Sequence, residues 1–229
     1  MRRFVDRREA GRLLSDRLSS YVGRPDVAVL ALPRGGVPVA FEIATRLGAP
    51  LDVLVVKKLG VPGREELAMG AVASGGIRVV DEHLVRALRI PDDVLAGVET
   101  AARAELERRE REFRDDLPQI DVEDKTAILI DDGLATGASM AAAIVALRTR
   151  SPVRIVVAVP VAPRETCAAL SSYADQVICL ITPEPLYAVG LWYEDFEQVS
   201  DTEVRELLDA ARRARTAAAS SETTAPPQH

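Results

Sequence analysis

Two adjacent acids, Asp131 and Asp132, follow a run of apolar residues and precede a loop of small and hydroxyl-bearing residues, in the sequence ILIDDGLATGAS of residues 128–139. Carboxylates at the end of a buried strand lie where open α/β sheets bind ligands, and they can accept hydrogen bonds from ribose hydroxyls. In the loop, small residues allow backbone N–H groups to surround a phosphate, and Thr136 and Ser139 can donate hydroxyl hydrogen bonds. The segment therefore predicts a site for a phosphorylated sugar.

Other templates for phosphate binding or hydrolysis do not fit the chain. A Walker A loop ends in Gly-Lys-Ser/Thr and the dinucleotide fingerprint is G-x-G-x-x-G, and neither occurs in the sequence. A nucleophile elbow needs a glycine two residues after its serine, where Ala141 stands after Ser139. A phosphoaspartate receiver domain also has an acid pair after a strand, but there the pair follows the first strand and here it follows the third.

At these residues the sequence resembles the type I phosphoribosyltransferases, whose signature is a hydrophobic strand, two acids and a small-residue loop that ends in Thr-Gly-x-Ser/Thr. Every position of that signature is matched. The resemblance implies that Asp131 and Asp132 hold the ribose. It also implies a phosphate loop made of Gly133, Leu134, Ala135, Thr136, Gly137, Ala138 and Ser139.

Two further segments agree with this family in order and spacing. The sequence LPRGGV after the first strand resembles the pyrophosphate loop, with Arg34 as the charge partner of the leaving group. Backbone contacts there would come from Pro33, Gly35 and Gly36. After the second strand, Lys57 and Lys58 resemble the basic start of the flexible loop that closes over pyrophosphate. Taken singly, each segment is as readily a strand-to-helix turn with a solvated cation.

The resemblance implies an activity and a cofactor. Enzymes of this family bind 5-phosphoribosyl-1-pyrophosphate with Mg²⁺, and a nucleophile, often a base nitrogen, displaces pyrophosphate at the ribose C1. Mg²⁺, Arg34 and Lys57 or Lys58 would stabilise the leaving group, and loop closure would exclude water. Contact with the metal would be indirect, through the ligand or water, at Asp131, Asp132 and Asp195. We therefore expect a phosphoribosyltransferase with a small-molecule acceptor; the alternative is a non-catalytic sensor or regulator on the same fold.

The elements that must position these residues follow from hydrophobic patterning. Short apolar runs predict buried strands at residues 27–32, 53–56, 127–130, 153–159 and 177–181. Helical spacing lies at residues 6–22, 37–47, 138–148 and 164–173. This alternation predicts an α/β fold with flanking helices. The resemblance implies a five-stranded, mainly parallel sheet of order 2-1-3-4-5, which brings together the loops after strands one and three.

We expect one phosphoribosyltransferase domain over residues 1–215, with an insertion at 57–118 and a C-terminal hood at 182–200. In the insertion, glycines and prolines predict a mobile hairpin, and Pro91 and Pro118 bound a long helix at 92–116. A final helix follows Asp201, and the Ala-, Ser-, Thr- and Pro-rich residues 216–229 predict a disordered tail.

Charges on the long helix admit two interpretations. Glu105 and Glu110 stand four residues before Arg109 and Arg114, which predicts i,i+4 ion pairs on a surface helix. The alternative is that Arg109 or Arg114 reaches the pyrophosphate pocket, because Arg109 falls on the apolar stripe and needs a partner there.

The sequence of the hood is the part of the chain that bears on the chemical class of the acceptor. Tyr187 and Trp192 could stack on its face or pack against the last strand. Residues 165–204 hold many acids and neither Lys nor Arg, so an anionic acceptor such as orotate would be repelled. A neutral or amine-bearing acceptor fits better than a 6-oxopurine bound through a lysine.

Bulk properties exclude other classes of partner. The net charge is −6 and the pI about 5.1, so no positive field is present to bind nucleic acid or an anionic membrane. The apolar runs are too short to span a bilayer, and the charged N-terminus indicates a cytoplasmic protein. Cys167 and Cys179 are expected to fill the core as thiols. The oligomeric state is left open, with a homodimer as one option.

Overall fold

A five-stranded sheet of order β2-β1-β6-β7-β8 forms the centre of the computed structural model, which describes residues 3–114 and 118–223. All neighbouring strands in it are parallel. The strands are β1 (Val27–Ala31), β2 (Leu51–Val53), β6 (Thr126–Ile130), β7 (Arg154–Val161) and β8 (Gln176–Ile181). Every residue of β1 and β6 is buried, as expected for strands covered on both faces. The predicted fold class and strand order are confirmed.

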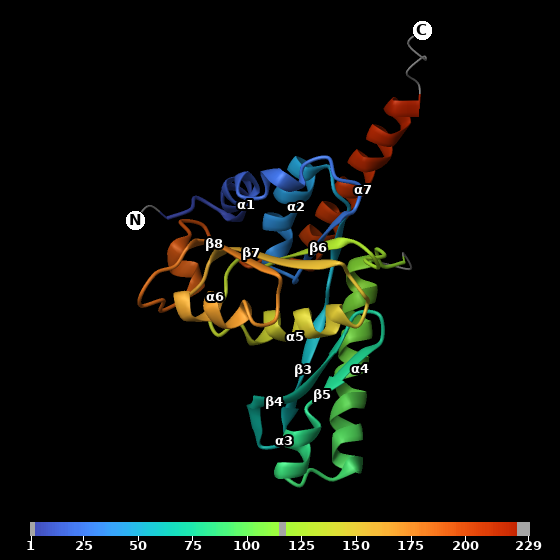
Figure 1. The fold of residues 1–229 in the computed structure, drawn as a ribbon, viewed down its shortest axis with the longest axis vertical. Helices are drawn as coiled ribbons and strands as arrows, with labels where there is room; N and C mark the ends of the chain where they lie inside the picture. The colour runs from blue at the N-terminus through green and yellow to red at the C-terminus, as the bar shows by residue number, and fades with distance from the viewer. Residues whose placement is uncertain (1–2, 115–117, 224–229) are drawn as a thin grey trace.

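Helices cover the two faces of this sheet as separate layers (Figure 1). One layer contains α1 (Arg7–Asp16), α2 (Gly36–Leu47) and α7 (Asp201–Thr223), and the other contains α5 (Ala138–Arg148) and α6 (Arg164–Leu170). Alternate residues of β1 belong to different core clusters: Val27, Val29 and Ala31 to one, Ala28 and Leu30 to the other. This alternation follows from the two-residue period of a strand. A short 3₁₀ helix, η1 (Ser19–Tyr21), follows α1.

The segment between β2 and β6 forms a second unit beyond α5 (Figure 1). It contains a three-stranded antiparallel sheet of β3 (Val56–Val61), β4 (Arg64–Ala73) and β5 (Ile77–Val80), followed by α3 (Glu82–Ala87) and α4 (Asp92–Arg114). The predicted hairpin is therefore present, and the long helix is present as far as Arg114; residues 115 and 116 of that prediction lie outside the described residues. Asp81 caps α3, because its Oδ1 accepts hydrogen bonds from the backbone N–H groups of His83 and Leu84 at 3.0 and 2.9 Å.

Two predictions differ from the structure. Helix α7 extends to Thr223, so residues 216–223 continue a helix where a disordered tail was expected; the alanines of this stretch are strong helix formers, and composition alone concealed that. Residues 224–229 lie outside the described residues. Cys167 and Cys179 form a disulfide with their Cα atoms 7.0 Å apart, which joins α6 to β8, rather than remaining thiols.

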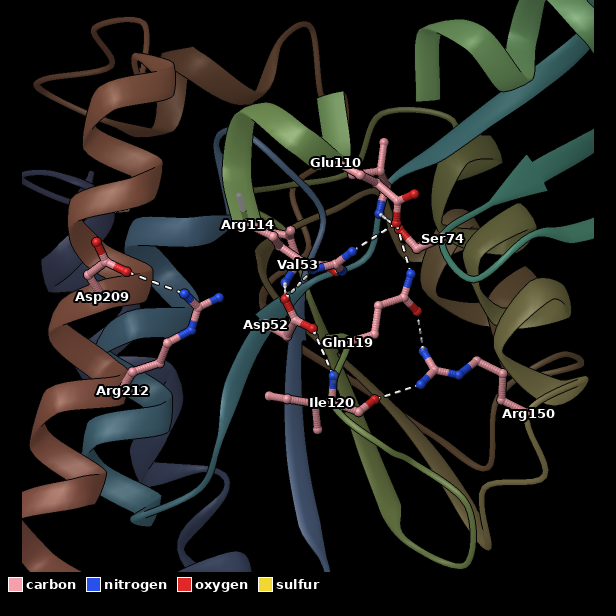
Figure 2. Close-up of polar contacts among 11 residues, drawn as sticks. Asp52, Val53, Ser74, Glu110, Arg114, Gln119, Ile120, Arg150, Asp209 and Arg212 are labelled. Atoms are coloured by element: carbon pink, nitrogen blue, oxygen red, sulfur yellow. Dashed lines mark hydrogen bonds and ion pairs between the residues drawn. The ribbon is translucent and has the colours of Figure 1, made fainter. Parts of the chain in front are cut away.

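Of the two α4 arginines considered for the pyrophosphate pocket, one lies on the surface and the other is buried. Arg109 is exposed and pairs with Glu105 at 2.8 Å, as the surface-helix interpretation predicts. Arg114 pairs with Glu110 at 2.8 Å but is buried, and its Nε donates to Asp52 Oδ1 at 2.7 Å (Figure 2). The alternative in which Arg114 reaches the pyrophosphate pocket is therefore wrong, because its guanidinium instead binds the carboxylate of Asp52 on β2.

Among the helices of residues 3–114 and 118–223, none combines the length and the apolar character needed to cross a membrane.

Candidate functional site

The acid pair Asp131 and Asp132 directly follows β6, at the carboxyl end of the parallel sheet. The backbone N–H of Asp132 donates to Asp131 Oδ1 at 2.9 Å, which fixes the first carboxylate against the turn. Arg7, the first residue of α1, donates from Nε to Asp132 Oδ2 at 2.8 Å. The side chains of Arg7 and Asp132 are 12% and 15% exposed, so this contact is shielded from water. Two carboxylates thus share the charge of one nearby guanidinium.

The surroundings disfavour full ionisation of this pair. Burial, together with the neighbouring Asp132 carboxylate, raises the pKa of Asp131 well above its ordinary value. Burial also raises the pKa of Asp132, although the hydrogen bond from Arg7 acts in the opposite direction. A ligand that supplies hydroxyl donors or a cation would relieve this cost. Ionisable groups perturbed in this way are typical of functional sites.

The loop after the acids leads into the N-terminus of α5, and most of its residues are exposed or half-buried. Ala135, Thr136, Ala138 and Ser139 are exposed, whereas Leu134 is buried and its N–H donates to Val161 O at 2.9 Å. Gly137 has φ +73°, a left-handed conformation that glycine adopts without strain, and it is the residue before α5. The loop thus places exposed residues at the N-terminus of a helix, where backbone N–H groups are generally available to anions.

Thr166, in the first turn of α6, contacts this loop through its side chain. It was not identified from the sequence. Its Oγ1 donates to Ala135 O at 2.9 Å. Its Cγ2 lies 2.7 Å from where a Cβ on Gly137 would be, so a larger residue at 137 would displace it. A lone threonine in a helix carries no local sequence signal for such a role.

The glycines of the predicted pyrophosphate loop lie against the acid pair. A Cβ on Gly35 would fall 2.0 Å from Asp132 Oδ2, and one on Gly36 would fall 2.7 Å from Ile130 O. Only glycine permits this close approach, so the loops after β1 and β6 are adjacent as predicted. Pro33 and Arg34 are joined by a cis peptide bond. The guanidinium of Arg34 is half-buried and lies 3.7 Å from the carboxylate of Asp201, at the start of α7.

Lys57 and Lys58 lie on β3, in the insertion. Together with Ser139 of the phosphate loop they line a cavity of about 950 Å³, to which α4 contributes Val98 and Glu105. The structure therefore brings the two lysines to the loop side of the site rather than to the acids.

The hood residues divide between an exposed and a buried set. Tyr187 is 84% exposed, and Trp192 is partly buried in the last 3₁₀ turn, η2 (Val189–Trp192). Tyr193, the next residue, is buried, and its hydroxyl donates to Asp132 O at 2.6 Å. Asp195 is exposed, and its Oδ1 accepts a hydrogen bond from Glu197 N at 3.0 Å. The hydrogen bond from Tyr193 thus ties the hood to the acid pair.

Comparison with known proteins shows similarity over most of the chain. The profile of the family described as phosphoribosyl transferase domain matches residues 6–191. Two curated proteins of Mycobacterium tuberculosis, from strains CDC 1551 and H37Rv, have names that provisionally describe a phosphoribosyl transferase. Each is 46% identical over 213 residues, covering 93% of this chain and 48% of its own length. The chain therefore spans about half the length of these curated relatives.

A solved structure is similar over almost its whole length. The crystal structure of the protein TT1426 from Thermus thermophilus shares 43% sequence identity and gives a TM-score of 0.81, covering 91% of this chain and 98% of that chain.

Proposed function

The chain belongs to the phosphoribosyl transferase domain family, and from that premise we propose that it transfers the 5-phosphoribosyl group from phosphoribosyl pyrophosphate to a nitrogenous acceptor, with release of pyrophosphate. The observation that carries the proposal is the close approach of Gly35 to the carboxylate of Asp132, which leaves no room for a Cβ at position 35. A ribose whose hydroxyls bind the acid pair would place its 1-pyrophosphate at the adjacent loop after β1. Its 5-phosphate would bind the loop that opens α5.

Charge on the leaving group would be balanced from two sides. Arg34 lies in the loop that would bind pyrophosphate, and its contact with Asp201 is long enough, at 3.7 Å, to be exchanged for a phosphate oxygen. Lys57 and Lys58 approach from the insertion, across the cavity that also contains Ser139. Cations that meet charge as it develops lower the barrier to departure of pyrophosphate.

Magnesium fits this site as an ion carried by the substrate. No group of three His, Cys, Asp or Glu side chains that could hold a metal occurs in residues 3–114 and 118–223. The acid pair nevertheless gains from a nearby cation, because both of its pKa values are raised, and Mg²⁺ prefers oxygen ligands. Asp131 and Asp132 would contact the ion through ribose oxygens or water. Its chemistry would be to neutralise pyrophosphate.

The acceptor is proposed to be neutral or amine-bearing. A cavity of about 300 Å³ lies between the start of α1, the hood and the start of α7. Two arginines, Arg7 and Arg8, line it, and they are outnumbered by four acids: Asp6, Asp195, Glu197 and Glu203. Acidic side chains favour an amino group and repel a carboxylate. Tyr187 and Trp192, the hood aromatics expected to stack on an acceptor, remain candidates for that role.

Pyrophosphate release tests the proposal directly. The protein is incubated with phosphoribosyl pyrophosphate, Mg²⁺ and hypoxanthine, guanine, xanthine, orotate, adenine or small amines. We expect release with a neutral or amine-bearing acceptor, and efficient use of orotate would contradict the charge argument. Binding of the donor in calorimetry without release by any acceptor would instead indicate a sensor. Absence of donor binding would overturn the proposal.

A further inference from the structure

We propose that Arg7 is a positioning residue that fixes the hood, residues 182–200, to the ribose-site acid Asp132. The inference rests on the proposed function, because it assigns Arg7 a part in arranging the same site. It adds a role for α1, which sequence patterning identified only as a helix.

One guanidinium makes three contacts that join separate parts of the chain. Its Nε donates to Asp132 Oδ2 at 2.8 Å, and its Nη1 donates to the backbone carbonyl of Glu197 at 2.8 Å. Its central carbon lies 3.9 Å from the ring centroid of Phe196, within cation–π range. A planar guanidinium can make such contacts at once, whereas an ammonium group is a point charge on a flexible stem.

The chain just before Arg7 is bound to the hood as well. Phe4 N–H donates to Trp192 O, and Glu194 N–H donates to Phe4 O, both at 2.8 Å. Asp195 N–H donates to Val5 O at 2.9 Å. The segment before α1 and the hood therefore form one unit, and this unit reaches the acid pair through Arg7 and through the Tyr193 hydroxyl.

This arrangement makes the orientation of the Asp132 carboxylate depend on the hood. The carboxylate lies between Arg7 and the glycine loop, so it cannot turn while Arg7 stays stacked on Phe196. Loss of Arg7 would free both the carboxylate and the residues around Trp192. Misplacement of a group that orients the substrate reduces turnover by up to about 100-fold.

The test uses Arg7→Gln, Arg7→Lys and the control Arg12→Gln. Arg12 lies on the same helix, is exposed, and approaches Glu42 at 3.7 Å, away from the acids. Trp192 is the single tryptophan of the chain, so its fluorescence reports on the hood without any substrate. Acrylamide quenching of Trp192 should increase in Arg7→Gln, stay at the wild-type level in Arg12→Gln, and lie between in Arg7→Lys.

Kinetics then separate positioning from binding. In Arg7→Gln we expect kcat to fall about 10- to 100-fold while the KM for phosphoribosyl pyrophosphate changes much less, with partial recovery in Arg7→Lys. Unchanged quenching and unchanged kcat in Arg7→Gln would overturn the inference. If Arg7→Gln does not fold by circular dichroism, Arg7→Lys decides, and wild-type quenching and kcat in that variant contradict the inference. Should the wild-type protein prove inactive, the proposed function fails, while the quenching comparison still decides whether Arg7 holds the hood.

Discussion

Two arginine–aspartate pairs, Arg114 with Asp52 and Arg7 with Asp132, differ in what surrounds the carboxylate. In the first, Asp52 Oδ1 accepts from Arg114 Nε at 2.7 Å and from Val53 N at 2.8 Å, and Oδ2 accepts from Ile120 N at 3.0 Å (Figure 2). Both oxygens therefore have donors within the protein. Around Asp132, by contrast, a second acid is adjacent and burial raises the pKa of both carboxyl groups.

The difference separates a structural ion pair from a site prepared for a ligand. The pair at Asp52 is almost wholly withdrawn from water, with side-chain exposures of 4% and 3%, and Gln119 and Arg150 extend its hydrogen bonds toward α5 (Figure 2). A buried carboxylate whose oxygens already accept hydrogen bonds within the protein is not prepared to bind a ligand. Two acids that share one arginine can still be stabilised in their ionised form by hydroxyl donors and a cation, which a ribose with Mg²⁺ would provide.

The largest effect should come from removing both acids of the ligand site. In Asp131→Asn with Asp132→Asn, transfer should fall by about 100-fold or more, because neutral amides replace the charged acceptors of the ribose hydroxyls and the positive charge that develops on the ribose loses its partners. Pyrophosphate release and calorimetry with phosphoribosyl pyrophosphate measure this. The fold should remain intact by circular dichroism. Unchanged affinity in the double variant would refute the assignment of the ribose site.

Breaking the structural pair should affect stability. Arg114→Met leaves Asp52 buried without its cation, which should lower the free energy of unfolding by about 3 to 5 kcal/mol. Urea unfolding gives this value, with Arg109→Met as the control on the same helix. Arg109 pairs with Glu105 on the surface, so its loss should cost less than about 1 kcal/mol. Equal effects of the two substitutions would remove the distinction between buried and surface pairs.

Asp131→Asn should stabilise the ligand-free protein at neutral pH. Because the folded-state pKa of Asp131 is raised, its contribution to stability is present below the ordinary carboxyl pKa and is lost as the pH rises through the folded value. The asparagine variant has no such loss. Its advantage over the wild type should therefore grow as the pH rises above the ordinary carboxyl pKa of 3.8 and level off once the raised folded-state pKa is passed, by about 1.4 kcal/mol for each unit by which the pKa is raised.

Urea unfolding at a series of pH values follows this advantage. The control is Asp121→Asn, because Asp121 is exposed and the backbone N–H of Glu123 lowers its pKa. That control should show no growing advantage with pH. If the free energy of unfolding differs by the same amount between wild type and Asp131→Asn at every pH, ionisation of Asp131 does not destabilise the folded protein as expected.

Sequence patterning could predict what is local in the chain. Strands covered on both faces are continuously apolar, so β1 and β6 could be predicted from residues near one another in sequence. The same holds for the acids and the loop that opens α5, which form one contiguous motif. The order of the sheet came from the family resemblance alone.

Contacts between distant segments could not be predicted in this way. Arg7 and Asp132 are 125 residues apart, Tyr193 and Asp132 are 61 apart, and Arg114 and Asp52 are 62 apart. Nothing in the local pattern of α1 or α4 distinguishes the arginine that turns inward from its exposed neighbours. Only the packing of the helices decides which cation lies beside which carboxylate.

The smallest effect is expected at the support of the phosphate loop. Thr166→Val keeps the methyl group that packs at Gly137 but removes the hydroxyl that donates to Ala135 O. Ala135 is exposed, so water can replace the lost donor, and the free energy of unfolding should change by less than about 1 kcal/mol. Because the same carbonyl orients the loop, the affinity for phosphoribosyl pyrophosphate should weaken by a few-fold, about 2 to 5. Calorimetry with Thr166→Ser as the control, which keeps the hydroxyl, measures this. Wild-type affinity in the valine variant together with weaker affinity in the serine variant, which lacks the methyl group, would show that the hydroxyl does not position the loop and that packing at Gly137 holds it.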